Sequence, residues 1–170
     1  VGRAKEVQKA QKAVEADTCP GDALPEIHPV MDTIRATFSD VNRSNVGFGS
    51  TIFAVKPGDG SAREQAASCQ KVLGGWANIA NEYATKRYRS NLINWGMIPF
   101  VIDQGDLPFH NLDYLFVPKI REAIADGKTE FEAYVVKDGA LKPFTLRMGE
   151  LTPDEKDIIL KGCLINYYRG

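Results

Sequence analysis

The sequence predicts an α/β domain with a mixed sheet, on three observations. Short apolar runs alternate with segments of helical period through the middle of the chain, as they do in parallel β-α-β units. Asp138-Gly139 lies between two strand-like runs near the C-terminus, which is a strong indication of a β-hairpin and therefore of antiparallel strands. The length of 170 residues suits one such domain with room for an added arm.

The first segment is the least apolar of the predicted elements. Residues 1–17 are rich in Ala, Lys, Gln and Glu, and Val7 and Val14 stand one heptad apart, which indicates a weakly amphipathic helix. Cys19-Pro20-Gly21-Asp22 ends it, because proline and glycine interrupt helices. We therefore expect an N-terminal helical linker or arm over 1–24 and the main domain over 25–170.

The remaining elements follow from period, caps and turn residues. Apolar residues repeat every four positions over 30–38, which predicts a helix, and Thr152 with Pro153 marks the start of the last one. The predicted strands are 51–55, 76–80, 98–102, 113–117, 131–136 and 141–147, and the predicted helices are 30–38, 62–73, 86–95, 118–125 and 152–161.

Composition and charge exclude several classes of function. The chain is 44% hydrophobic and 25% charged with a formal net charge of −1, as in ordinary soluble proteins. A near-neutral chain has no electrostatic attraction to nucleic acid or to an anionic membrane. No apolar run reaches the length of a membrane span, and no signal-peptide pattern opens the sequence. We expect no membrane contact and no nucleic acid partner. Because the first residue is Val, we also expect a processed or excised piece.

The cysteines do not form a local metal site. Cys19, Cys69 and Cys163 are far apart and include no Cys-x-x-Cys pair, so their spacing supports neither a zinc nor an iron–sulfur centre. A sparse, odd count is typical of a reducing compartment, which predicts a cytoplasmic location. We expect Cys69 to be buried on its helix.

The turn after the first predicted strand carries the most chemistry. Gly58-Asp59-Gly60 leads into the helix at 62–73, and Ser61 with Glu64 fits the Ser-x-x-Glu capping box. Backbone N–H groups at a helix start stabilise an anion, and Arg63 adds a planar cation suited to a carboxylate or phosphate. A P-loop fits poorly, since no Lys-Ser/Thr pair closes the turn. Taken alone, the turn is compatible both with an anion site and with a plain helix cap.

Three ordered motifs extend this pattern. They are Gly58-Asp59-Gly60-Ser61-Ala62-Arg63-Glu64-Gln65-Ala66, then Leu73-Gly74-Gly75, then the segment 91–100 with its Gly96-Met97-Ile98-Pro99. Together with the late hairpin and last helix, residues 45–170 resemble the C-terminal swivel domain of aconitase and its relatives, including the small subunit of isopropylmalate isomerase. The first motif of that family reads Gly-x-Gly-Ser-Ser-Arg-Glu-His-Ala.

The resemblance implies a three-layer β/β/α swivel fold and an aconitate hydratase-like hydro-lyase acting on a citrate-like or related hydroxy-carboxylic acid. By position, Ser61 is the expected catalytic base, Arg63 the carboxylate-binding residue, and Gly60 and Ala62 further substrate-binding positions. The resemblance assigns no cofactor to this chain and a four-iron, four-sulfur cluster to the missing domains or large subunit. The isolated chain is therefore expected to be inactive.

Two positions depart from the family motif. Ala62 replaces the second serine and removes a hydroxyl, and Gln65 replaces the usual histidine behind the turn. Because the expected base and the expected carboxylate-binding residue are both retained, we favour an active enzyme part with an altered substrate. A non-catalytic anion-binding module or a purely structural partner remains the alternative.

Overall fold

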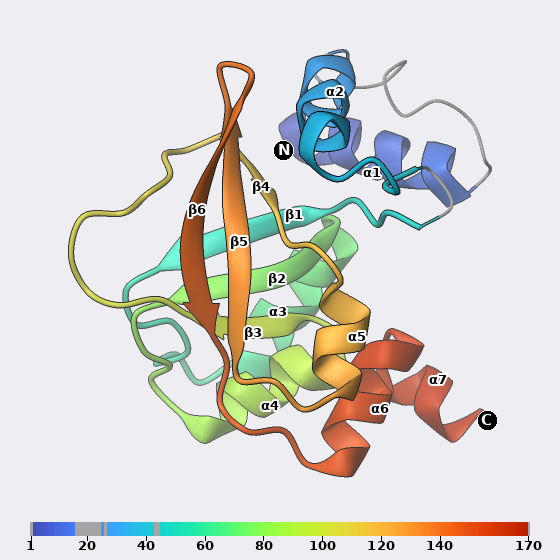
Figure 1. Cartoon of the computed structure of the whole chain (residues 1–170). Helices are drawn as coiled ribbons and strands as arrows, with labels where there is room; N and C mark the ends of the chain where they lie inside the picture. The colour runs from blue at the N-terminus through green and yellow to red at the C-terminus, as the bar shows by residue number, and fades with distance from the viewer. Residues whose placement is uncertain (1, 16–24, 26, 43–44, 170) are drawn as a thin grey trace.

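The computed structural model describes residues 2–15, 25, 27–42 and 45–169 (Figure 1). Its helices and strands are α1 (Gly2–Glu15), α2 (Ile27–Thr37), β1 (Ser50–Ala54), α3 (Arg63–Val72), β2 (Gly75–Ala80), α4 (Lys86–Asn94), β3 (Ile98–Val101), β4 (Tyr114–Phe116), α5 (Ile120–Ala125), β5 (Glu130–Lys137), β6 (Ala140–Arg147), α6 (Pro153–Lys161) and α7 (Leu164–Tyr168). As far as α6 they follow one another in the order predicted from the sequence, and the short helix α7 after it was not predicted.

The six strands form one mixed sheet in the order β1-β2-β3-β6-β5-β4. β1, β2 and β3 are parallel, whereas β6, β5 and β4 pair antiparallel. β3 meets β6 through the pair Val101 and Arg147, so the two halves can bend away from each other. Figure 1 shows β5 and β6 crossing in front of β1–β3, with α3 and α4 behind. The predicted three-layer β/β/α arrangement is confirmed.

Several aromatic rings contact one another in the core between the two β layers. Phe100 packs edge-on against Phe131 at 5.4 Å between ring centroids, and Phe109 lies 5.9 Å from Phe53 and 5.8 Å from Phe144. Such ring pairs add to the free energy gained by burying their area. They hold the hairpin layer against the parallel strands.

A second cluster fills the space between the parallel strands and the helices. It contains the buried residues Ala67, Tyr88, Leu92 and Met97, contributed by α3, by α4 and by the turn after α4. Tyr88 of this cluster lies against Gly58, which belongs to the segment that connects β1 to α3.

The N-terminal helix packs against the rest of the chain. Val7 and Ala10 of α1 are buried together with Ile27 of α2. The Gln11 side chain donates hydrogen bonds to the carbonyls of Phe48 and Gly74, at 2.9 and 3.1 Å. The boundary expected at residue 24 and the side chain of Val14 lie outside the described residues, so the division into 1–24 and 25–170 stays a prediction.

The local structure confirms the predicted hairpin turn and the predicted start of the last helix, and it contradicts the predicted burial of Cys69. Asp138 and Gly139 have φ of 52° and 72°, as a two-residue hairpin turn of type I′ requires. Thr152 and Glu155 form a complete capping box on α6. The prediction that Cys69 is buried is wrong, because its side chain is exposed. Ala67 faces the interior from α3, and a residue two positions later lies about 200° further round the helix.

None of the described helices combines the length and the apolar character that crossing a membrane demands.

Candidate functional site

The candidate site is the segment 55–62, here called the signature loop, which joins β1 to α3. It leaves β1 at the strand's carboxyl end, and because β1–β3 are parallel, the segments after β2 and β3 leave at the same edge. Ligands of α/β proteins bind at this edge of the sheet. The fold therefore places the loop where a binding site is expected.

Long-range hydrogen bonds hold the start of the loop. The backbone N–H of Glu82 donates to the carbonyl of Val55 at 3.1 Å, and that of Ala84 to the carbonyl of Pro57 at 2.9 Å. Lys56 also forms an ion pair with Glu82. The loop is thereby tied to the segment that follows β2.

Ser61 does not cap the helix, so the capping box predicted for Ser61 and Glu64 is wrong. α3 begins at Arg63 and its N-cap is Ala62, one residue later than the pattern requires, with no side-chain cap bond. The first helical hydrogen bond runs from the N–H of Ala66 to the carbonyl of Ala62. Ser61 is exposed, and its hydroxyl has no hydrogen bond partner within the described part of the chain. The hydroxyl is therefore available to a ligand.

Arg63 is held by one nitrogen of its guanidinium. Its Nε donates to the carbonyl of Gly58 at 3.0 Å, and the side chain is half-buried. Among the residues the structure describes, none bonds to the two terminal amino groups of Arg63. An arginine fixed in this way still presents two N–H groups in the geometry that a carboxylate binds.

The structure requires glycine at position 58 but leaves space for a side chain at position 60. Gly58 has φ of +97°, and a Cβ there would lie 2.5 Å from the Cβ of Tyr88, so conformation and space both demand glycine. At Gly60 a Cβ would meet nothing within 4 Å. Gly60, Ser61 and Ala62 are all exposed, and together they form an open surface beside Arg63.

Other groups at this edge were not found from the sequence. Arg147, at the end of β6, forms an ion pair with Asp103, two residues after β3. Asn81, just after β2, donates to the carbonyls of Ile102 and Asp103 at 3.1 and 3.2 Å. Only the pairing of β3 with β6 brings these residues together, and no local pattern indicates that pairing.

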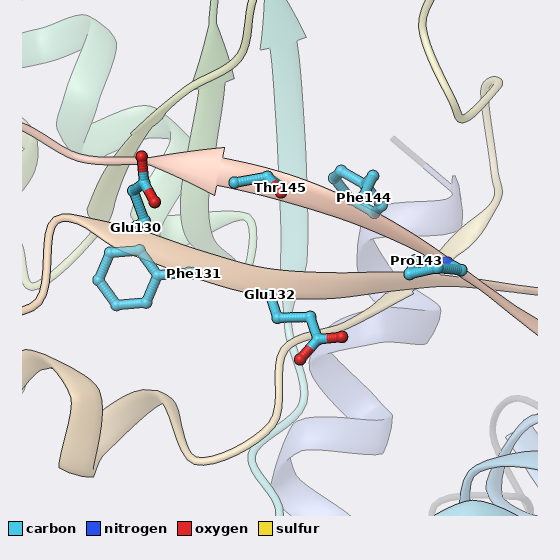
Figure 2. Close-up of a pocket in the computed structure, with 6 residues that line it drawn as sticks. All are labelled: Glu130, Phe131, Glu132, Pro143, Phe144 and Thr145. Carbon is cyan, nitrogen blue, oxygen red and sulfur yellow. The ribbon is translucent and has the colours of Figure 1, made fainter.

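A hollow of about 360 Å³ lies elsewhere, along the β5–β6 hairpin (Figure 2). The residues that line it are Glu130, Phe131, Glu132, Pro143, Phe144 and Thr145. Its charged groups are two carboxylates, which repel an anionic ligand. We therefore place the candidate site for a carboxylate at the signature loop.

The described residues do not form a site for a metal cluster. Within 2–15, 25, 27–42 and 45–169, no three side chains of His, Cys, Asp or Glu gather closely enough to hold an ion. Of the two cysteines that the structure describes, Cys69 is exposed and Cys163 is half-buried. This part of the chain does not fit an iron–sulfur cluster.

The three-layer fold carries a Gly-x-Gly-Ser-x-Arg loop at the carboxyl edge of its parallel strands, which is the arrangement expected from the resemblance to the aconitase swivel domain. Residues 37–105, which include β1–β3 and the signature loop, match the aconitase C-terminal domain family. This match covers the part of the chain that carries the motifs, and it supports the resemblance to the aconitase swivel domain that those motifs indicated.

A solved structure has the same fold. The crystal structure of 3-isopropylmalate dehydratase (leuD) from Methanocaldococcus jannaschii aligns over 83% of this chain and 77% of its own, with a TM-score of 0.52 and 24% sequence identity. No curated protein sequence matches the chain.

Proposed function

We propose that this chain is the swivel domain or small subunit of an aconitase-like hydro-lyase that removes and adds water at a citrate-like or related hydroxy-carboxylic acid. One observation carries the proposal: a serine hydroxyl without a partner among the described residues and an anchored arginine lie two residues apart at the carboxyl edge of the sheet. The fold and the family match support it.

In this proposal Arg63 binds a substrate carboxylate. Its Nε is occupied by the Gly58 carbonyl, so the terminal amino groups form the two parallel hydrogen bonds. The first N–H groups of α3 add partial positive charge in the same place. Gly60 and Ala62 let the substrate approach the backbone, since no bulky side chain covers either position.

Ser61 is the proposed base, and its Oγ takes the proton from the carbon next to the bound carboxylate. A serine hydroxyl is a feeble base unless the alkoxide is stabilised. The guanidinium of Arg63 and the N–H groups of α3 stabilise negative charge strongly only when water is excluded. Lewis-acid chemistry at the leaving hydroxyl belongs to the four-iron, four-sulfur cluster expected on the missing domains.

The exposure of the loop agrees with a site that needs a second half. Gly60, Ser61 and Ala62 face solvent in this chain. Since exposed charges act in high dielectric, binding and proton transfer here need a covering surface. We propose that an iron–sulfur-bearing domain or large subunit supplies that surface, that the isolated chain is inactive, and that the complete enzyme is cytoplasmic.

A second function would leave the same fold intact. Ala62 and Gln65 replace a serine and a histidine of the family motif, so the loop could bind an anion without catalysis or serve as a structural partner. The two functions differ in one respect: only the enzyme requires the Ser61 hydroxyl for turnover.

The test is Ser61→Ala in the complete enzyme, isolated with the large subunit that co-purifies with this chain. Because Ser61 caps nothing, the variant should melt at the parent's temperature while hydration activity falls at least about 10²-fold. Ser68→Ala, which removes a hydroxyl bonded to the Gln65 carbonyl on the same helix, is the control and should keep full activity. Near-normal turnover of Ser61→Ala would leave only the non-catalytic functions.

A further inference from the structure

Tyr88 lies beneath the signature loop. It is in the first turn of α4, 30 residues beyond Gly58 in the sequence, and is 2% exposed. Its N–H donates to the hydroxyl of Thr85, the N-cap of that helix, at 3.1 Å. The position of the ring is thus fixed to the start of α4.

The ring of Tyr88 fills the space that any side chain at residue 58 would need. A Cβ on Gly58 would lie 2.5 Å from both the Cβ and the Cγ of Tyr88, and 2.7 Å from Cδ1. The Gly58 backbone therefore rests directly on the tyrosine. Removing the ring would open a gap under the loop, and buried gaps of this size are not tolerated without rearrangement.

Two amide side chains hold the Tyr88 hydroxyl. The Nε2 of Gln70 donates to it at 3.0 Å and the Nδ2 of Asn78 at 3.3 Å. The Gln70 Oε1 and Asn78 Oδ1 are buried without a partner among the described residues. If the side-chain amide of Gln70 or Asn78 is flipped by rotation, its oxygen faces Tyr88 and accepts the hydroxyl proton. The hydroxyl oxygen then still accepts a hydrogen bond from the other amide. The three side chains thus form one buried network that fixes the ring.

These contacts form one chain of support from the core to the proposed site. The network of Gln70 and Asn78 fixes Tyr88, Tyr88 supports Gly58, and the Gly58 carbonyl accepts the hydrogen bond of Arg63 Nε. We infer that Tyr88 is a positioning residue, which sets the direction of the Arg63 guanidinium without touching the substrate. The consequence for catalysis rests on the proposed function, whereas the effect on Arg63 itself does not.

The experiment follows the Nε–Hε proton of Arg63 by NMR in the ¹⁵N-labelled full chain, with Arg63→Lys identifying its signal. Its exchange with solvent reports the bond to Gly58 directly, because hydrogen-bonded protons exchange slowly. Tyr88→Ala removes the ring, including the Cγ and Cδ1 atoms nearest Gly58, and should speed exchange at least about tenfold. Tyr88→Phe keeps the ring against Gly58 and should restore exchange to within about threefold of the parent, even though its melting temperature falls.

Phe109→Ala is the matched control. It removes a ring from the other core, where Phe109 contacts Phe53 and Phe144, and so lowers stability without touching Gly58. It should leave Arg63 exchange within about threefold of the parent. Unchanged exchange in Tyr88→Ala, or equal acceleration in Phe109→Ala, would overturn the inference.

If Tyr88→Ala does not fold, Gly58→Ala tests the same contact from the loop side. Its Cβ cannot coexist with Tyr88, so the loop must move and exchange at Arg63 must accelerate; slow exchange in this variant also overturns the inference.

In the complete enzyme, Tyr88→Ala should raise KM by a larger factor than it lowers kcat, since Arg63 binds substrate before the reaction. Fast exchange in Tyr88→Ala together with unchanged turnover of Arg63→Lys would contradict the proposed function and leave the positioning role intact.

Discussion

The Cα of Gly96 lies against the carbonyl of Gly162, so closely that a Cβ on Gly96 would fall 1.7 Å from that oxygen. The two glycines follow α4 and α6, and their φ values are +71° and +90°. Each ends its helix with a left-handed residue, as helix C-termini commonly do. Because Gly96 has no side chain, the C-terminal ends of α4 and α6 can touch.

The first prediction is that Gly96→Ala destabilises the chain by more than about 2 kcal/mol, because the methyl group meets backbone that cannot yield. Gly139→Ala is the control, since it has a similar φ of +72° but open space around its Cβ. It should cost only the conformational strain, about 1 kcal/mol. Urea unfolding of both variants measures the difference, and equal losses would show that the contact with Gly162 is unimportant.

The second prediction compares two sites that match the same capping pattern. The Thr152 hydroxyl accepts from the N–H of Glu155 at 3.2 Å, and the Glu155 carboxylate accepts from the N–H of Thr152 at 2.9 Å. Thr152→Ala should therefore cost about 1 kcal/mol of unfolding free energy. Ser61→Ala should cost nothing measurable, because Ser61 makes no cap bond. A loss of similar size in both variants would contradict the start of α3 at Arg63.

The same comparison shows how far sequence reasoning reaches. At Thr152 the local pattern decides the structure, because Pro153 fixes the first helical φ and both partners of the box lie within three residues. At Ser61 the preceding loop is tied to residues 82–84 by backbone bonds, and α3 begins one residue later than the box requires. Long-range contacts override local propensity there.

The order of strands and helices and the type I′ turn at Asp138-Gly139 were predictable because each depends on neighbouring residues. The support of Gly58 by Tyr88 spans 30 residues, and the pairing of Asp103 with Arg147 spans 44. No periodicity links such residues, so the parts of the site that come from packing could not be predicted from a single sequence.

The third prediction concerns Lys71, a half-buried residue in the last turn of α3. Burial lowers the pKa of its amine, partly offset by the nearby Cys163. The folded chain thus binds fewer protons than the unfolded chain between the lowered pKa and the ordinary value of 10.5, so stability rises with pH across that window. Lys71→Met should raise the melting temperature at pH 7, and the gain should fade as the pH approaches 10.5.

Thermal melts from pH 7 to above the ordinary lysine pKa check this, with Lys86→Met as the control at an exposed helical position. The Lys86 variant should show no gain that fades with pH. A constant gain for Lys71→Met would attribute the effect to the apolar side chain rather than to the charge.

The last prediction is that Arg63→Lys lowers kcat/KM of the complete enzyme by about tenfold or more while the fold persists. Lysine has neither the Nε–H that donates to Gly58 nor the paired amino groups that bind a carboxylate in parallel. Its charge remains, so the loss measures geometry and not net charge. Arg87→Lys, at an exposed arginine of α4, is the control and should keep its kinetics. Parent-like kcat/KM for Arg63→Lys, with an unchanged melting temperature, would mean that another residue holds the substrate carboxylate.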